Sequence, residues 1–255
     1  MDKEKLEQSL ETIRQAYAGA IDSETPLFVN FSGGKDSSCV LLLAKMVAEN
    51  NVEAIYMSSG IELPGTIEFV EQEAKKYDVK LHIVKPDEHY LGDFEFWVRK
   101  FGYFPACGYT FCSSRLKIRP ARAYLRKLYG KKHMYRMNGV RKPESTRRTK
   151  MYKDALPIDK DGDLAGSFKV MPILEWTDDD VKEFLAENNV SIHKQYSEFG
   201  VSGCAYCPFY QVYIFQKILN VYPNIYDNII KLEEELGQPA VKGHIFLGDI
   251  KKEMQ

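Results

Sequence analysis

The chain has 255 residues, of which 44% are apolar, and a formal net charge of −1 from 35 basic and 36 acidic residues. This length suits one large domain or one domain with an appendage, and the apolar content is sufficient for a sizeable core. No apolar run is long enough to span a bilayer, and the charged start Met1-Asp2-Lys3 is unlike a secretory signal. These features exclude a membrane protein and agree with a soluble enzyme, which we expect in the cytoplasm.

Strand-like and helix-like segments alternate along the first 140 residues. Alternation at this spacing predicts an α/β fold with a doubly wound, mainly parallel sheet. Ligands of such sheets bind beyond the carboxyl ends of the strands. The expected strands cover residues 26–31, 53–57, 80–84 and 134–140, and the expected helices cover residues 3–19, 37–49 and 65–77.

A glycine-rich loop follows the first strand and precedes a helix. Its two glycines let the backbone approach an anion, and the helix start and Lys35 both add positive charge. The loop therefore predicts a site for a phosphate-rich ligand, although its spacing is neither that of the Walker loop nor that of the dinucleotide fingerprint. It reads Ser32-Gly33-Gly34-Lys35-Asp36-Ser37-Ser38.

This loop resembles the pyrophosphate (PP) loop of the ATP pyrophosphatase superfamily, whose members attack ATP at the α-phosphate and release pyrophosphate. Later motifs, in matching order, make residues 26–210 similar to the phosphoadenosine phosphosulfate (PAPS) reductase family, and especially to its DNA phosphorothioation branch. The resemblance implies an adenine nucleotide α hydrolase-like fold with a helical, cysteine-containing C-terminal part. The later motifs are residues 111–120, 139–148, 172–177 and 203–208.

The pattern changes after residue 165, so we expect a nucleotide-binding domain over 1–165 and a C-terminal extension over 166–255. A helix is expected to begin after Thr177, and helix capping explains the acidic residues 178–180 in its first turn better than a metal site does. Aromatic residues over 208–236 fit a core stripe or partner surface better than a base-stacking platform.

The resemblance also implies roles in binding Mg²⁺ and ATP. Lys35, Asp36 and Arg141 are the expected catalytic residues: Lys35 neutralises the departing pyrophosphate, Asp36 orients the loop or helps to hold Mg²⁺, and Arg141 lies near the α-phosphate or the acceptor. A serine pair and a glycine after the second strand are expected beside the adenosine. The full nucleotide-binding set is Ser32, Gly33, Gly34, Lys35, Asp36, Ser37, Ser38, Ser58, Ser59, Gly60, Gly139 and Arg141.

Basic residues are concentrated between Arg99 and Lys153, where 17 Lys or Arg face one acidic residue, Glu144. The rest of the chain has 18 basic and 35 acidic residues. A solvated helix face explains part of this segment, but an anion larger than ATP explains it better, with nucleic acid as the leading candidate. The expected anion-binding residues are Arg115, Lys117, Arg119, Arg147 and Arg148.

Four of the five cysteines form two close pairs, Cys107-x4-Cys112 and Cys204-x2-Cys207. Four thiolates around one centre suit tetrahedral zinc or a [4Fe-4S] cluster. Spacing alone slightly favours Zn²⁺, whereas the resemblance favours the cluster, and free or redox-paired thiols are a third interpretation. Cys39 is expected to be a buried hydrophobic residue.

Taken with the resemblance, these features predict an ATP pyrophosphatase that adenylates an oxygen of a nucleic-acid backbone, preferably DNA, for sulfur insertion. A cysteine desulfurase is the expected sulfur donor, and a homodimer is the oligomeric form considered. The residues after Gly243 contain no cysteine, unlike the mobile tail of true PAPS reductases. A PAPS or APS reductase, a tRNA thiolation enzyme, a sulfate or flavin adenylyltransferase and a nucleic-acid-binding module are the alternatives.

Overall fold

The computed structural model describes residues 2–106, 110–155, 167–201 and 203–254. Contacts divide the chain into two units, and the chain passes between them several times. The first unit therefore extends beyond the expected boundary at residue 165. It comprises Met1–Tyr56, Ile67–Ile83 and Tyr124–His193, and the second comprises Met57–Thr66, Val84–Ala123 and Lys194–Gln255.

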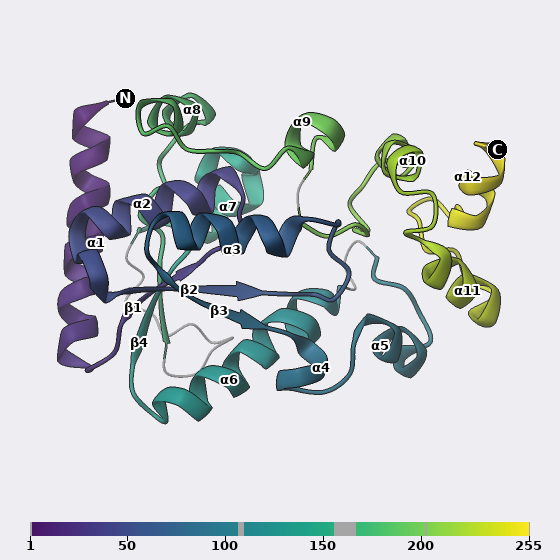
Figure 1. Cartoon of the computed structure of the whole chain (residues 1–255), viewed down its shortest axis with the longest axis horizontal. Helices are drawn as coiled ribbons and strands as arrows, with labels where there is room; N and C mark the ends of the chain where they lie inside the picture. The colour runs from purple at the N-terminus through teal and green to yellow at the C-terminus, as the bar shows by residue number, and fades with distance from the viewer. Residues whose placement is uncertain (1, 107–109, 156–166, 202, 255) are drawn as a thin grey trace. The chain divides into compact units, whose positions relative to one another are not determined.

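The first unit is built on a five-stranded sheet with the strand order β3-β2-β1-β4-β5 (Figure 1). Parallel pairing joins β1 to β2, β1 to β4 and β4 to β5. The predicted doubly wound α/β fold is confirmed, and its strand order reverses between β1 and β4, where such sheets bind ligands. The strands are β1 (Leu27–Asn30), β2 (Val52–Met57), β3 (Lys80–Val84), β4 (Met134–Met137) and β5 (Ser167–Val170).

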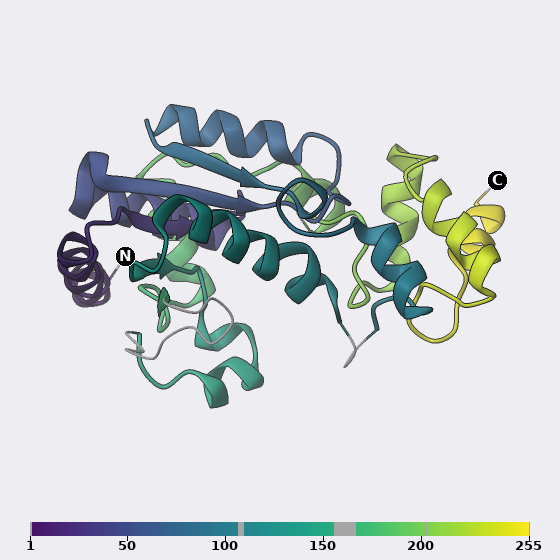
Figure 2. The same ribbon diagram turned by 90° about the horizontal axis from the view of Figure 1, so that it is seen from below.

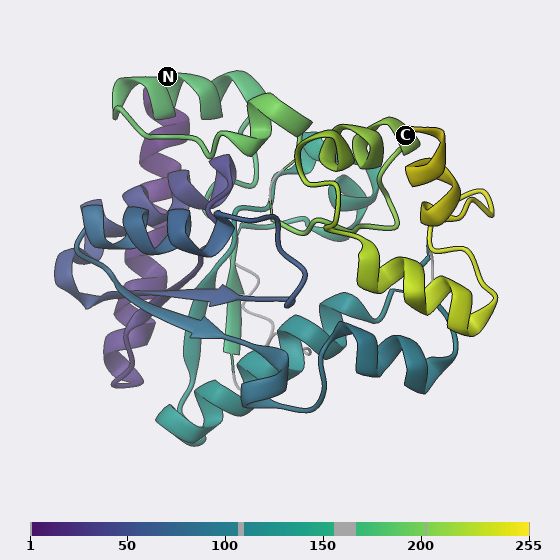
Figure 3. The same cartoon turned by 45° about the vertical axis from the view of Figure 1, so that its right-hand side comes forward.

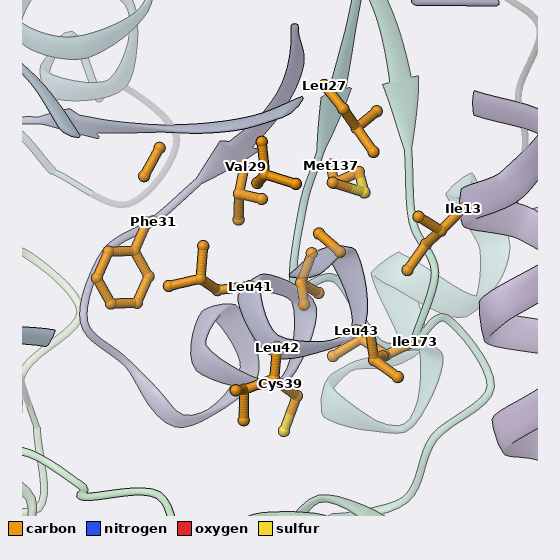
Figure 4. Packing of buried hydrophobic residues seen from close by; sticks show 14 of the residues in the cluster. Ile13, Leu27, Val29, Phe31, Cys39, Leu41, Leu42, Leu43, Met137 and Ile173 are labelled. Carbon is orange, nitrogen blue, oxygen red and sulfur yellow. The ribbon is translucent and has the colours of Figure 1, made fainter. Parts of the chain in front are cut away.

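Helices cover both faces of this sheet, with α2 and α3 on one side and α6 on the other (Figure 1). The face of α2 that packs against the sheet is apolar. Figure 4 shows Leu27, Val29 and Met137 of the strands on the side of the sheet where Leu41 of that helix lies. Cys39 is fully buried in the same cluster, as predicted. The helices are α1 (Lys3–Asp22), α2 (Lys35–Ala48), α3 (Thr66–Lys76), α6 (Arg119–Tyr129), α7 (Thr146–Met151) and α8 (Asp178–Glu187).

A polar network lies on the α6 side of the sheet, which Figure 2 shows from below. The carboxylate of Glu53 on β2 is 2.6 Å from Nε2 of His82 on β3 and accepts from the Tyr129 hydroxyl at 3.0 Å. Nδ1 of His82 is 2.7 Å from the hydroxyl of Tyr124. Burial alone would raise the pKa of Glu53, but hydrogen bonds from His82, Lys80 and Tyr129 outweigh it and lower that pKa to about 2.

The second unit is helical and has an aromatic core. The hydroxyl of Tyr206 donates to the carbonyl of Ala240 at 2.6 Å, and that of Tyr226 donates to the carbonyl of Ala205 at 2.8 Å, so both polar ends are satisfied in the core. Helices α5, α10, α11 and α12 pack together around it (Figure 3). The elements are α4 (Pro86–His89), α5 (Phe94–Phe101), a π-helix (Ser113–Ile118), α9 (Gln195–Phe199), α10 (Val212–Val221), α11 (Asp227–Leu236) and α12 (Leu247–Glu253).

The aromatic segment 208–236 is not continuous, because α10 ends before Pro223 and α11 begins at Asp227. Phe215 and Tyr226 are buried, as expected of a core stripe. Phe209 and Tyr213 are instead 60% and 55% exposed. Within the described residues, every helix is too short or too polar to cross a membrane.

Candidate functional site

The glycine-rich loop joins β1 to α2 at the reversal of strand order. Gly33 has a φ of +73°, which an L side chain rarely adopts, and a Cβ there would lie 2.9 Å from the Cγ2 of Val70. Gly34 is the N-cap residue of α2 and has no side-chain cap. The start of a 14-residue helix is thus left without a side-chain acceptor, which favours an anionic ligand.

The loop serines hold the backbone in this shape. The hydroxyl of Ser37 donates to the carbonyl of Gly34 at 2.9 Å and lies 3.2 Å from the backbone N–H of Ser32. The Ser38 hydroxyl donates to the same carbonyl at 3.1 Å, and both side chains are buried. Ser37 and Ser38 therefore fix the loop, and their contact with phosphate stays a prediction.

Arg141 is the most deeply buried charged residue at this position, with 1% of its surface exposed. Its Nε donates to Asp36 Oδ1 at 2.7 Å, and its Nη2 donates to Asp178 Oδ1 at 2.9 Å. Its Nη1 donates to the carbonyl of Trp176 at 3.3 Å. The guanidinium is therefore held in one orientation by contacts on three sides.

Lys35 completes a ring of two cations and two carboxylates. Its Nζ donates to Asp178 Oδ1 at 2.9 Å and to Asp36 Oδ1 at 3.3 Å. Hydrogen bonds from Lys35 and Arg141 lower the pKa of Asp178. All three predicted catalytic residues, Lys35, Asp36 and Arg141, are thus brought together at the start of α2.

Gly139 explains how the loop after β4 reaches this position. A Cβ on Gly139 would lie 2.7 Å from the backbone carbon of Asp36 and 2.9 Å from the nitrogen of Ser37. Those distances are too short for a side chain, so glycine is required where the two backbones touch.

Asp178 is a site residue that the sequence analysis missed. The helix-capping interpretation holds for Thr177 and Asp180, which form a capping box at the start of α8. Asp178 is not needed for that cap and instead contacts Lys35, 143 residues earlier. The sequence indicated only that Asp178 lies in the first turn of a helix. Its pairing with the glycine-rich loop is visible only in the tertiary fold.

Ser58, Ser59 and Gly60 belong to the second unit. The hydroxyls of Ser58 and Ser59 donate to the carboxylate of Glu62 at 3.1 and 2.9 Å, and the N–H of Ser59 binds the same group. The N–H of Gly60 donates to Ser58 Oγ at 3.1 Å. These residues form a turn organised by Glu62, and their contact with adenosine stays a prediction.

Three of the four paired cysteines lie among the described residues of the second unit, whereas Cys107 lies outside them. Cys204 Sγ is 3.3 Å from Ser59 Oγ and 3.7 Å from Lys117 Nζ. Burial, together with the proximity of Cys204 and Cys207, raises the pKa of Cys112 to about 12. Within the described ranges no three His, Cys, Asp or Glu side chains are arranged to hold a metal ion.

The predicted anion-binding residues have different surroundings. Arg115 lies over the ring of Trp97, Arg119 contacts the hydroxyl of Tyr90, and Lys117 points to Cys204, whose proximity raises the pKa of Lys117. Arg148 pairs with Glu144 on the first unit. The side chain of Arg147 is outside the described part of the chain.

A parallel sheet with a glycine-rich loop at its reversal point is the architecture of the adenine nucleotide α hydrolase-like fold. A profile of the phosphoadenosine phosphosulfate reductase domain matches residues 26–210. The chain belongs to this family, within the PP-loop superfamily. The resemblance of residues 26–210 to the PAPS reductase family is confirmed, and the likeness to its DNA phosphorothioation branch stays a prediction.

Curated relatives are longer than this chain. An uncharacterized protein of Methanocaldococcus jannaschii is 32% identical over 238 residues, which cover 92% of this chain and 54% of the relative. A second uncharacterized protein of that organism is 25% identical, with 98% of this chain and 52% of the relative covered. The chain thus spans about half the length of these relatives.

Solved structures share the fold at low sequence identity. PAPS reductase from Candida auris, in a phosphate complex, superposes with a TM-score of 0.52 at 18% identity, covering 80% of this chain and 96% of that one. FMN adenylyltransferase from Candida glabrata, with FMN and an ATP analogue, superposes with a TM-score of 0.52 at 12% sequence identity, and the match covers 80% of this chain and 66% of that one. NH3-dependent NAD synthetase from Campylobacter jejuni superposes with a TM-score of 0.50 at 18% sequence identity, and the match covers 100% of this chain and 94% of that one. The family thus rests on the profile match, whereas these solved structures show the shared fold alone.

Proposed function

We propose that this chain cleaves ATP at the α-phosphorus and adenylates an oxygen of a nucleic-acid backbone, preferably DNA, so that sulfur can replace that oxygen. The observation that carries the proposal is the ring of Lys35, Arg141, Asp36 and Asp178 at the uncapped start of α2. Both cations are positioned before a ligand arrives, which is the arrangement that electrostatic catalysis of phosphoryl transfer requires.

In the first step, an acceptor oxygen bonds to the α-phosphorus and the bond from that phosphorus to pyrophosphate breaks. Lys35 neutralises the charge that develops on the pyrophosphate, and Arg141 stabilises the α-phosphate. Asp36 orients Arg141, which it contacts at 2.7 Å, and provides a carboxylate oxygen of the kind that Mg²⁺ binds. By holding the acceptor oxygen and the α-phosphorus in reacting geometry, these groups supply most of the acceleration over the uncatalysed reaction.

In the second step, the terminal sulfur of a persulfide attacks the acceptor phosphorus, and AMP leaves with the activated oxygen. A further thiol then takes the carrier sulfur into a disulfide and releases the phosphorothioate. A cysteine desulfurase is the proposed source of the persulfide. The excess of basic residues between Arg99 and Lys153 supports a polyanionic acceptor.

A metal centre is a separate part of this proposal. Cys107, Cys112, Cys204 and Cys207 would hold a [4Fe-4S] cluster, or alternatively Zn²⁺, because four thiolates suit either. Such a centre would supply structural support for the second unit or a place to relay sulfur. Metal analysis and the visible absorption of anaerobically purified protein, with Cys204→Ser as the comparison, test this part: a cluster absorbs in the visible range and zinc does not.

Release of AMP and pyrophosphate from Mg·ATP tests the function. We expect Lys35→Ala to lower this rate at least about 100-fold, as expected for loss of a group that stabilises developing charge. Lys182→Ala is the control, because Lys182 lies on α8 with 72% of its side chain exposed. Stimulation of the wild-type rate by DNA would support phosphorothioation, and stimulation by tRNA alone would instead favour tRNA thiolation.

A nucleotide sulfate reductase is the second candidate, and the match of residues 26–210 to the PAPS reductase domain favours it. This alternative predicts binding of adenylyl sulfates and no turnover of ATP. Absence of pyrophosphate release from folded protein under every condition would refute adenylation and favour the reductase.

A further inference from the structure

Aromatic rings form a continuous row along α5 and the residues that directly follow it in the second unit. The rings of Trp97 and Phe101 stack with centroids 5.3 Å apart, and those of Phe101 and Tyr103 stack at 5.7 Å. Phe96 adds an edge contact to Trp97 at 5.3 Å. Trp97 is 2% exposed, whereas Phe96 and Tyr103 are 38% and 37% exposed. The inner rings thus belong to the core and support outer rings that reach solvent.

Two cations lie directly over this row. The guanidinium of Arg115 is 4.6 Å from the ring centre of Trp97 and 5.7 Å from that of Phe101. Nζ of Lys100 is 5.1 Å from the ring centre of Trp97 and 5.4 Å from that of Phe96. Each cation is therefore held beside a π-face while its charge stays available.

Tyr90 and Arg119 extend the same surface. Nη1 of Arg119 donates to the hydroxyl of Tyr90 at 3.1 Å, and Tyr90 is 39% exposed. Arg119 and then Arg115 lower the pKa of that hydroxyl, so both guanidinium groups lie near it. We call Tyr90, Phe96, Lys100, Tyr103, Arg115 and Arg119 the aromatic–cation surface.

The cations of this surface are not engaged in ion pairs within the described part of the chain, although Asp93 and Glu95 line the same hollow as Phe96 and Lys100. Across the described ranges, Lys100, Arg115 and Arg119 form no ion pair with a carboxylate, whereas the adjacent Arg99 is bound by Glu95 and Glu235. Packing of the hydrophobic core does not explain why three cations lie on this surface. An apolar protein partner would have to bury these cations without ion-pair partners, at a cost of several kcal/mol. A partner with both flat apolar faces and negative charge satisfies rings and cations together.

We infer that the aromatic–cation surface binds unpaired nucleotides of a nucleic-acid strand, with bases stacked on Phe96 and Tyr103 and phosphates beside Lys100, Arg115 and Arg119. The chemistry fits an unpaired strand rather than a duplex, because a duplex keeps its base faces inside its own stack. This inference rests on the proposed function for its choice of a nucleic-acid acceptor. It adds that the acceptor is presented single-stranded or locally opened.

Binding of fluorescent oligonucleotides to the full chain tests the inference. A strand of about 12 nucleotides, within the length that such surfaces cover, is compared with its own duplex by fluorescence polarisation. We expect the single strand to bind more tightly, and the double variant Phe96→Leu/Tyr103→Leu to weaken that binding about tenfold or more. Leucine preserves apolar contacts but removes the π-face, so we expect the variant to stay folded, and its circular dichroism spectrum checks this.

The control variant is Phe209→Leu, because Phe209 is an aromatic residue of the same unit that lies outside this surface and is even more exposed than Phe96 and Tyr103. An unchanged affinity in Phe96→Leu/Tyr103→Leu, an equal loss in the control, or a duplex bound as tightly as the strand would each overturn the inference. DNA and RNA strands of the same sequence distinguish the two sources of unpaired nucleotides, and preference for either supports it. Pyrophosphate release from Mg·ATP is measured in a separate assay, with and without nucleic acid and against Lys35→Ala, so failure of the proposed function is detected independently of strand binding.

Discussion

The start of α2 and the aromatic–cation surface both collect positive charge, but they hold it in opposite ways. At α2, Lys35 and Arg141 are paired with Asp36 and Asp178, and Arg141 is almost fully buried. On the aromatic–cation surface, Lys100 and Arg115 lie on aromatic rings. Paired, buried cations are fixed in position and must exchange a carboxylate for a ligand, whereas ring-bound cations accept a ligand without losing a partner.

The largest expected difference between the two regions concerns folding. We expect Arg141→Met to lower the free energy of unfolding by about 3 kcal/mol, because it removes a buried cation and leaves the mostly buried carboxylate of Asp36 with only the longer contact to Lys35. Arg115→Met is expected to cost only about 1 kcal/mol, since it loses a cation–π contact at a part-exposed position. Urea unfolding of both variants measures the difference. Equal losses would mean that the two environments do not differ as described.

Local sequence was sufficient to predict the part of the site that one strand, one loop and one helix start form together. The loop from Ser32 to Ser38 could be placed because its glycines and the flanking apolar runs are adjacent in sequence. Gly139 and Arg141 could be assigned to the same sheet edge because parallel strands bring their carboxyl ends together. Family resemblance then added the expected roles.

Contacts between distant segments could not be predicted in this way. Asp178 looked like a second helix-capping acid, because the sequence does not show that α8 starts beside α2. The basic segment was interpreted as one anion surface, but Lys117 contacts a cysteine and Arg115 contacts aromatic rings. Charge density along a sequence does not say which partner each cation has, and that partner decides what the cation can bind.

A second paired network tests whether buried pairing makes this first unit sensitive to acid. Because hydrogen bonds hold the pKa of Glu53 at about 2, below its ordinary value of 4.5, its contribution is complete above pH 4.5 and is lost as pH falls towards 2. We expect the wild type to lose about 2–3 kcal/mol over that range through Glu53, which is 15% exposed.

Unfolding in urea between pH 5 and pH 2.5 measures this loss, and Glu53→Gln should flatten it. Glu88→Gln is the matched control, because Glu88 forms an exposed pair with Lys85 that contributes little. An unchanged pH dependence in Glu53→Gln would show that the Glu53–His82 network is not the source of acid sensitivity.

The smallest effect is also the most direct test of ligand exchange at α2. If phosphate must displace the carboxylate of Asp178 from Lys35 and Arg141, then Asp178→Asn weakens the competitor and should tighten binding of Mg·ATP about fivefold, equivalent to about 1 kcal/mol. Asp179→Asn is the control, since Asp179 has the same charge in the same turn but contacts only the exposed Lys182 in the described structure. Calorimetric titration of both variants separates this exchange from a general change in charge, which would affect the two equally. Weaker binding in Asp178→Asn alone would mean that Asp178 holds the cations in place for the nucleotide, and that the paired ring is a preformed site rather than one that opens.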